Sequence, residues 1–290
     1  MEIFAHSLNF ILMLALPVAL GFILARRLRV GWQVWGVGVV TFIASQVVHL
    51  PLIFGLTKLF QNGVLPAPPE AWTTAFNAVV LGLAAGVCEE TARYLVYRFW
   101  ITRARTWREA LMFGAGHGGI EAIIFGGLVG LTFINMVVLR DTAVTSLPVS
   151  ADQQVLAAQQ IAAYWATPWT EALLGAVERL FAMCFHLSAA VLVLQAIKRR
   201  NLLWLGAAIL WHSTLDALAV MVLAAWGVYW AEAAVGGLAL VNLAIIFLLR
   251  PTIDDAPPAE PVATLPSTAT PVAEDSESQL KRQLDESRFN

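Results

Sequence analysis

The sequence predicts an all-α protein, a polytopic membrane helix bundle with about seven transmembrane helices. Hydrophobic residues make up 59% of the 290 residues and charged residues only 13%, whereas a typical soluble domain has about 25% charged residues. The apolar residues also gather in runs of about 20 or more, the length that an α-helix needs to cross roughly 30 Å of hydrocarbon. This composition excludes an ordinary soluble domain.

Seven apolar segments are long enough to span a bilayer. Their predicted bounds are 5–25, 34–57, 73–98, 110–139, 169–197, 202–223 and 228–249. The first segment ends in ARRLRV without a small-residue cleavage site, so we expect it to stay in the protein as a span. The two cysteines, Cys88 and Cys184, fall inside apolar segments and predict no disulfide framework.

Basic residues predict the orientation of the spans, because cytoplasmic loops are enriched in Lys and Arg. Ten of them follow spans one, three and five: Arg26, Arg27, Arg29, Arg98, Arg103, Arg105, Arg108, Lys198, Arg199 and Arg200. The opposite loops carry only Lys58 and Arg140. We therefore expect a multi-pass protein of the bacterial cytoplasmic membrane, with its N-terminus outside and its C-terminus in the cytoplasm.

Two segments outside the spans have distinct compositions. The external loop from Asp141 to Thr167 contains ADQQVLAAQQIAAYWA, which predicts a short helix on the membrane surface. After Arg250 the chain becomes rich in Pro, Ala and Glu, and such a segment cannot bury a core. The predicted organisation is a transmembrane bundle over residues 1–250, with a polar site in spans three to six, followed by a disordered cytoplasmic tail over residues 251–290.

Polar side chains on four different spans lie at a common depth. Placing a charge at the centre of a membrane helix costs roughly 2.5–3.5 kcal/mol on insertion scales, so such residues mark function by default. With a rise of 1.5 Å per residue, the polar residues lie about 12–18 Å from the cytoplasmic ends of their spans. They are Glu89, Glu90, His117, Glu121, His186 and His212. Their convergence, with three of five histidines, predicts one shared site.

Spacing within each span supports a common site. Three pairs are separated by four residues and therefore share a helix face: Glu89 with Arg93, His117 with Glu121, and His212 with Asp216. A carboxylate one turn from an imidazole can orient it, or both can bind one metal ion. Arg93 is expected to neutralise Glu89, leaving Glu90 to point elsewhere. Four glycines around His117 permit close helix approach: Gly114, Gly116, Gly118 and Gly119.

Four motifs on successive spans resemble those of the YhfC family of putative intramembrane metalloproteases. In order they are CEETAR, GHGGIEA, ERLFAMCFHLS and HSTLD, over about residues 80–220. That family is related to the CAAX prenyl endopeptidase and bacteriocin-processing (CPBP) group. The first motif is EExxR instead of EExxxR and the second HxxxE instead of FxxxH, which puts a prenylated protein substrate in doubt.

The resemblance implies roles for individual residues. Glu89 or Glu90 with His117 would activate water, and His212 with Asp216 matches the last motif, which assists the oxyanion. Three imidazoles plus a carboxylate suit a divalent metal, and the expected ion is zinc. The expected ligands are His117, His186 and His212, helped by Glu121 or Asp216, and Arg93 would hold the glutamates or the oxyanion.

The predicted function is therefore that of a metal-dependent intramembrane endopeptidase, which hydrolyses a peptide bond in or near the membrane. Its expected partners are membrane lipid and a membrane-bound protein or peptide substrate, and no nucleic acid. Two alternatives stay open. A non-catalytic membrane scaffold of the same fold would keep the polar layer as a packing network, and an ion- or proton-coupled transporter also places His and Glu at mid-depth.

Overall fold

A computed structural model describes residues 1–251, and every regular element in this range is helical. The long helices are α1 (Glu2–Leu28), α2 (Trp32–Gln61), α3 (Thr73–Leu95), α4 (Trp107–Arg140), α7 (Leu174–Lys198), α8 (Leu203–Trp226) and α9 (Val228–Leu248). The short elements are η1 (Glu70–Trp72), the π-helix η2 (Val96–Trp100), η3 (Val144–Ser146), α5 (Ala151–Ala166) and α6 (Trp169–Ala172). The predicted all-α class is confirmed.

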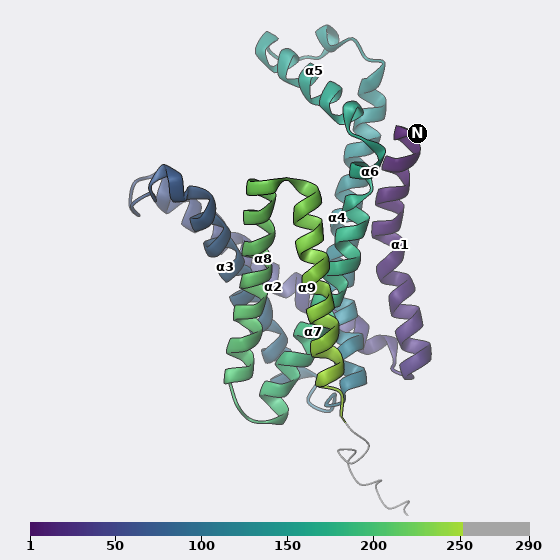
Figure 1. Cartoon of the computed structure of the whole chain (residues 1–290), viewed down its shortest axis with the longest axis vertical. Coiled ribbons are helices and arrows are strands. Elements are labelled where there is room, and N and C mark those ends of the chain that lie inside the picture. The colour runs from purple at the N-terminus through teal and green to yellow at the C-terminus, as the bar shows by residue number, and fades with distance from the viewer. Residues whose placement is uncertain (252–290) are drawn as a thin grey trace, which may run out of the picture. The chain divides into compact units, whose positions relative to one another are not determined.

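Seven of these helical segments are long and apolar enough to cross a membrane. They correspond one to one with the predicted spans, so the prediction of a polytopic membrane bundle is confirmed. Figure 1 shows α5 beyond one end of the bundle, at the end where α8 turns into α9. The loop from α7 to α8 lies at the opposite end, where the three basic loops gather. We call these the α5 end and the basic end.

The helix ends differ from the predicted bounds by a few residues, because hydropathy does not register caps. Thr106 and Glu109 form a reciprocal capping box that starts α4 at Trp107, before the predicted residue 110. Ser150 and Gln153 form a second capping box and start α5, which covers all of the predicted surface segment. The fifth span is interrupted at Leu173, between α6 and α7.

The centre of the bundle is the half of α7 that lies toward the basic end. Every residue from Phe185 to Ala196 is buried, and α4 is buried without interruption from Ala110 to Gly119. Helix α7 packs against α4, α9, α8, α1 and α3. Because lipid tails are as apolar as Leu, such packing depends on close van der Waals contact between helices.

Glycines allow that contact. A Cβ atom on Gly116 would lie 1.9 Å from the carbonyl oxygen of Trp35 in α2, and one on Gly118 would lie 2.4 Å from the His186 ring. Gly114 is equally crowded by the backbone of α7, at 2.5 Å. The prediction of close approach is confirmed for these three positions, whereas Gly119 has room for a side chain, with its nearest neighbour at 3.4 Å.

Glycines of α3 play the same part toward α8. Added Cβ atoms at Gly82 and Gly86 would each lie 2.8 Å from a carbonyl oxygen of α8, those of Ser213 and Ile209. The two helices therefore approach backbone to backbone, which places the glutamates of α3 beside the histidine of α8. The predicted disordered tail, residues 251–290, lies outside the described residues except for Pro251.

Candidate functional site

The predicted polar residues of α3, α4, α7 and α8 form one connected cluster, and all but Glu121 and Asp216 are buried. Glu90, Arg93 and His117 are fully buried, and Glu89, His186 and His212 are no more than 5% exposed. Direct contacts link all eight residues named from the sequence, so the common depth corresponds to a common place. We call this group the polar cluster: Glu89, Glu90, Arg93, His117, Glu121, His186, His212 and Asp216.

Arg93 is the central cation of the cluster. It forms an ion pair with Glu90 three residues earlier, and its Nη2 lies 3.7 Å from Glu89 Oε2. The same Nη2 donates a hydrogen bond to His186 Nδ1, at 2.8 Å. The expectation that Glu90 points away from Arg93 is wrong, because positions three and four residues apart both face the same side of a helix.

Glu90 is enclosed between Arg93 and α8. His212 Nδ1 donates to Glu90 Oε1 at 2.8 Å, and His212 Nε2 lies 3.4 Å from Asp216 Oδ2. Both ring nitrogens of His212 therefore face carboxylate oxygens. Within the described residues the buried Glu90 Oε2 has no hydrogen-bond partner.

Glu89 lies on the other side of Arg93, toward α4 and α2. His117 Nε2 donates to Glu89 Oε2 at 3.1 Å, and Gln46 Nε2 of α2 donates to Glu89 Oε1 at 3.2 Å. Gln46 was not among the predicted site residues. The signal was the polar pair Ser45–Gln46 inside a mostly apolar span, which alone is common in helix packing.

His186 is held in a single tautomer by its two partners. Because its Nδ1 accepts from Arg93, its Nε2 carries the proton and donates to Glu121 Oε2, at 2.8 Å. Glu121 thus meets the imidazole of α7, while His117, one turn away on its own helix, turns to Glu89. Arg179 of α7 holds Glu121 in place through a 2.7 Å hydrogen bond and also pairs with Glu178. Arg179 was not among the predicted site residues.

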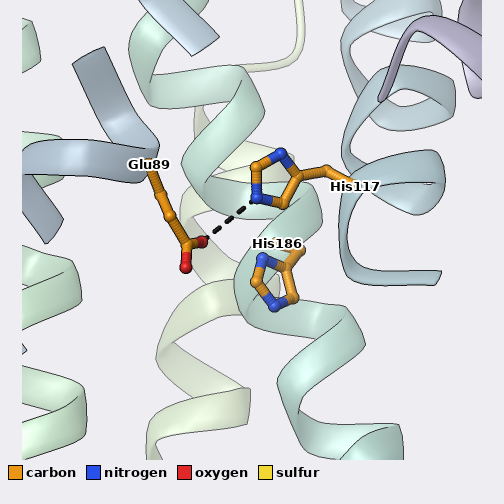
Figure 2. Close-up of side chains that lie close together, drawn as sticks. All are labelled: Glu89, His117 and His186. Carbon is orange, nitrogen blue, oxygen red and sulfur yellow. Dashed lines mark hydrogen bonds and ion pairs between the residues drawn. The ribbon is translucent and has the colours of Figure 1, made fainter. Parts of the chain in front are cut away.

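Three of the clustered residues could hold one metal ion. Glu89, His117 and His186 each offer one ligand atom, and these atoms lie within 4.8 Å of one another. Figure 2 shows the three side chains converging from three helices. The set shares His117 and His186 with the predicted ligands and has Glu89 in the place of His212. The predicted ligation by His212 stays a prediction.

The donor chemistry of this triad suits a divalent metal. One carboxylate and two imidazoles are a known zinc ligand set, and His117 turns its Nε2 toward Glu89, at 3.1 Å. Glu121 on His186 Nε2 is the carboxylate–histidine arrangement that orients a metal-binding imidazole. In this structure Arg93 Nη2 donates a hydrogen bond to His186 Nδ1. A metal ion bound to this nitrogen would displace that hydrogen bond, and Arg93 would keep its ion pair with Glu90.

A cavity of about 140 Å³ adjoins the cluster. Glu89, Glu121, His186, His212 and Asp216 face it from four helices, whereas Glu90 and His117 are not among its lining residues. The remaining wall consists of α7, α8 and α9 residues that include Arg179 and Phe185. The arrangement therefore offers carboxylates and imidazoles to a small molecule such as water.

Helix bundle and polar cluster together define a polytopic membrane protein with a buried Glu/His site. A family model described as YhfC intramembrane metalloprotease matches residues 12–245, and the chain belongs to this family. It is similar to the uncharacterized membrane protein YhfC of Bacillus subtilis (strain 168), with 33% identity over 210 residues that cover 71% of this chain and 79% of that protein. No solved structure matches the chain.

Proposed function

We propose that this protein is a metal-dependent endopeptidase that hydrolyses a peptide bond in or near the membrane. The observation that carries the proposal is the triad of Glu89, His117 and His186, whose ligand atoms lie within 4.8 Å of one another beside a cavity. The name of its family agrees with this chemistry. In the reaction the C–N bond breaks, water gives its hydroxyl to the carbonyl carbon, and its proton goes to the leaving amine.

The triad would hold the metal, with zinc as the best match to a carboxylate and two imidazoles. When bound, the ion would polarise the substrate carbonyl and lower the barrier to attack by water. Glu121 and Arg179 would keep His186 in the correct tautomer and orientation. Gln46 would fix the orientation of Glu89, by donating a hydrogen bond to the carboxylate oxygen that faces away from His117.

Proton transfer falls to groups that face the cavity. His212 lines it with Asp216 at its Nε2, so this pair is placed to take a proton from water and return it to the leaving amine. Glu90 would position His212 through its Nδ1, and Arg93 would hold Glu90. The assignment of this step to Glu89 or Glu90, which the sequence suggests, stays a prediction. Of these two, Glu89 lines the cavity.

Metal analysis of the purified full-length protein in detergent tests the ligand set. We expect one zinc ion per chain, lost on Glu89→Gln, His117→Ala or His186→Ala and kept on His212→Ala. His6→Gln is the control, because His6 is buried away from the cluster in a stack with Tyr164. Loss of metal with His212→Ala would instead support the three-histidine set.

Activity is tested by mass spectrometry of new N-termini after incubating proteoliposomes with a library of membrane-anchored peptides. Wild-type protein should generate cleavage products that His117→Ala and Asp216→Asn do not. A folded wild-type protein that binds no metal and cleaves nothing would count against the peptidase and favour the scaffold. Ion-dependent uptake into the same proteoliposomes would favour the transporter.

A further inference from the structure

The polar cluster is closed toward the basic end of the bundle. Tyr97 and Phe113 lie on that side, are both fully buried, and pack ring to ring with centroids 4.9 Å apart. The Tyr97 hydroxyl donates to the Ala190 carbonyl oxygen. Beyond them the unbroken buried stretches of α4 and α7 continue toward the basic loops. The residues on this side pack into one hydrophobic core.

Toward the α5 end the cavity continues past the cluster. Three small or apolar lining residues mark its course: Ala182 lies one turn from His186 on α7, Ala219 two turns from His212 on α8, and Val235 two turns from the start of α9. On α7 and α8 this direction is toward the α5 end, and α9 starts at that end. Glu178 and Arg179 also line it, and the Glu178 side chain is 43% exposed. The cavity therefore extends from buried imidazoles to a carboxylate at the protein surface.

We propose that water and substrate reach the cluster from the α5 end, through the cavity between α7, α8 and α9. The walls combine Phe181, Phe185, Leu215 and Val235 with the cluster's carboxylates, and a volume of about 140 Å³ leaves room only for a small group. The substrate part of the proposal rests on the proposed function. The proposed substrate is a membrane-anchored peptide with a small apolar side chain next to the cleaved bond. It would enter from the side of the membrane where α5 lies.

Cysteine labelling of the full chain tests the route without requiring activity. In a Cys88→Ser/Cys184→Ser background, single cysteines replace Val235 or Ala219 in the cavity wall. Val193→Cys is the matched control, since Val193 is fully buried on the basic side of His186. Val→Cys changes little volume, so both valine variants should fold. Asp152→Cys in α5 and Thr102→Cys between α3 and α4 mark the two sides, because both positions are exposed.

Whole cells and inverted vesicles are treated with a membrane-impermeant trimethylammonium methanethiosulfonate reagent. We expect Val235→Cys and Ala219→Cys to react in the preparation in which Asp152→Cys reacts, and Val193→Cys to react in neither. Reaction of the cavity cysteines from the Thr102 side, or no reaction from either side, would overturn the route. A protein that labels as expected but cleaves no peptide would contradict the proposed function and leave the route standing.

Discussion

In the half of the bundle near the basic end, α4 and α7 bury every residue of Ala110–Gly119 and Phe185–Ala196, whereas in the half near the α5 end the same two helices expose a residue in most turns. The polar cluster lies at the boundary between these halves. One half fixes the positions of the imidazoles through glycine contacts, and the other leaves a cavity beside them. Close packing and access are thus divided between the two ends of the same helices.

The largest difference between the halves is expected in the free energy of unfolding that is lost when one partner of an ion pair is removed. Glu90→Ala leaves the buried Arg93 with Glu89, 3.7 Å away, as its only carboxylate partner among the described residues, and removing one partner of a buried ion pair costs about 3–5 kcal/mol. Glu178→Ala, which removes the half-exposed partner of Arg179, should cost at most about 1 kcal/mol. Unfolding titrations in mixed micelles measure both free energies.

The control for this comparison removes both charges. Glu90→Leu/Arg93→Met should recover most of the stability lost in Glu90→Ala, because apolar residues of similar volume often replace a buried ion pair without loss. Equal destabilisation by Glu90→Ala and Glu178→Ala would contradict the contrast between the halves.

The next largest difference in stability is expected between two glycine-to-alanine substitutions at crowded and uncrowded positions of the same helix, α4. Gly116→Ala introduces a methyl group 1.9 Å from the Trp35 carbonyl oxygen, whereas Gly127→Ala on the same helix meets nothing within 4 Å. Overpacking typically costs about 1–3 kcal/mol, and an alanine in an uncrowded helix gains up to about 1 kcal/mol over glycine. Thermal unfolding should therefore shift down for Gly116→Ala and stay level or rise for Gly127→Ala. A fall for both would show that α4 is equally crowded at both ends.

If the proposed triad binds an ion, the metal affinities of two variants test the boundary between the halves, where the polar cluster lies. Glu121→Gln weakens the contact that orients His186, and losing such a partner usually lowers metal affinity about 10–100-fold. Glu178→Gln is the matched control, because Glu178 pairs with the same Arg179 but does not touch His186. Competition with a chromogenic zinc chelator measures both affinities. An equal loss in the two variants would assign the effect to Arg179 instead.

The smallest effect is expected in α5, which has no buried residue. Ser150→Ala removes the cap of this helix, a change worth about 1 kcal/mol to the helix itself. Amide hydrogen exchange should become faster in the first turn of α5 only, while the melting temperature of the bundle stays the same. A lower melting temperature would mean that α5 supports the bundle as a whole.

Much of the fold follows from local sequence. Seven apolar runs predict seven spans because a bilayer demands length and hydrophobicity in each segment separately. The segment at residues 151–166 predicts α5 equally well, since its caps and its helix-forming residues are adjacent in the chain. The ends of α4 and α7 depend on caps and on a break at Leu173, which a hydropathy window averages away.

The site was predictable in its membership but not in its pairings. Depth in the membrane alone predicts that Glu89, His117, His186 and His212 belong to one site, because the predicted directions of the spans place these residues at similar depths. The spacing of His117 and Glu121 predicts that Glu121 orients His117 or that both bind one metal ion. In the structure Gly118 lets the His186 ring approach α4 and pair with Glu121. Such a choice depends on helix rotation and contact distance, which no single segment encodes. Gln46 was missed for the same reason.

The pairing of Arg93 with the glutamates of its own helix also has a consequence for biogenesis. The partners from later helices, His186 for Arg93 and His212 for Glu90, lie far along the chain, and the contact between His212 and Glu90 spans 122 residues. At ribosomal speeds this separation corresponds to a delay on the order of ten seconds. During that interval α3 enters the translocon with charges that only its own neighbours can neutralise. The ion pairs within α3 are available at once, so they make a segment with two glutamates insertable before the histidines have been synthesised.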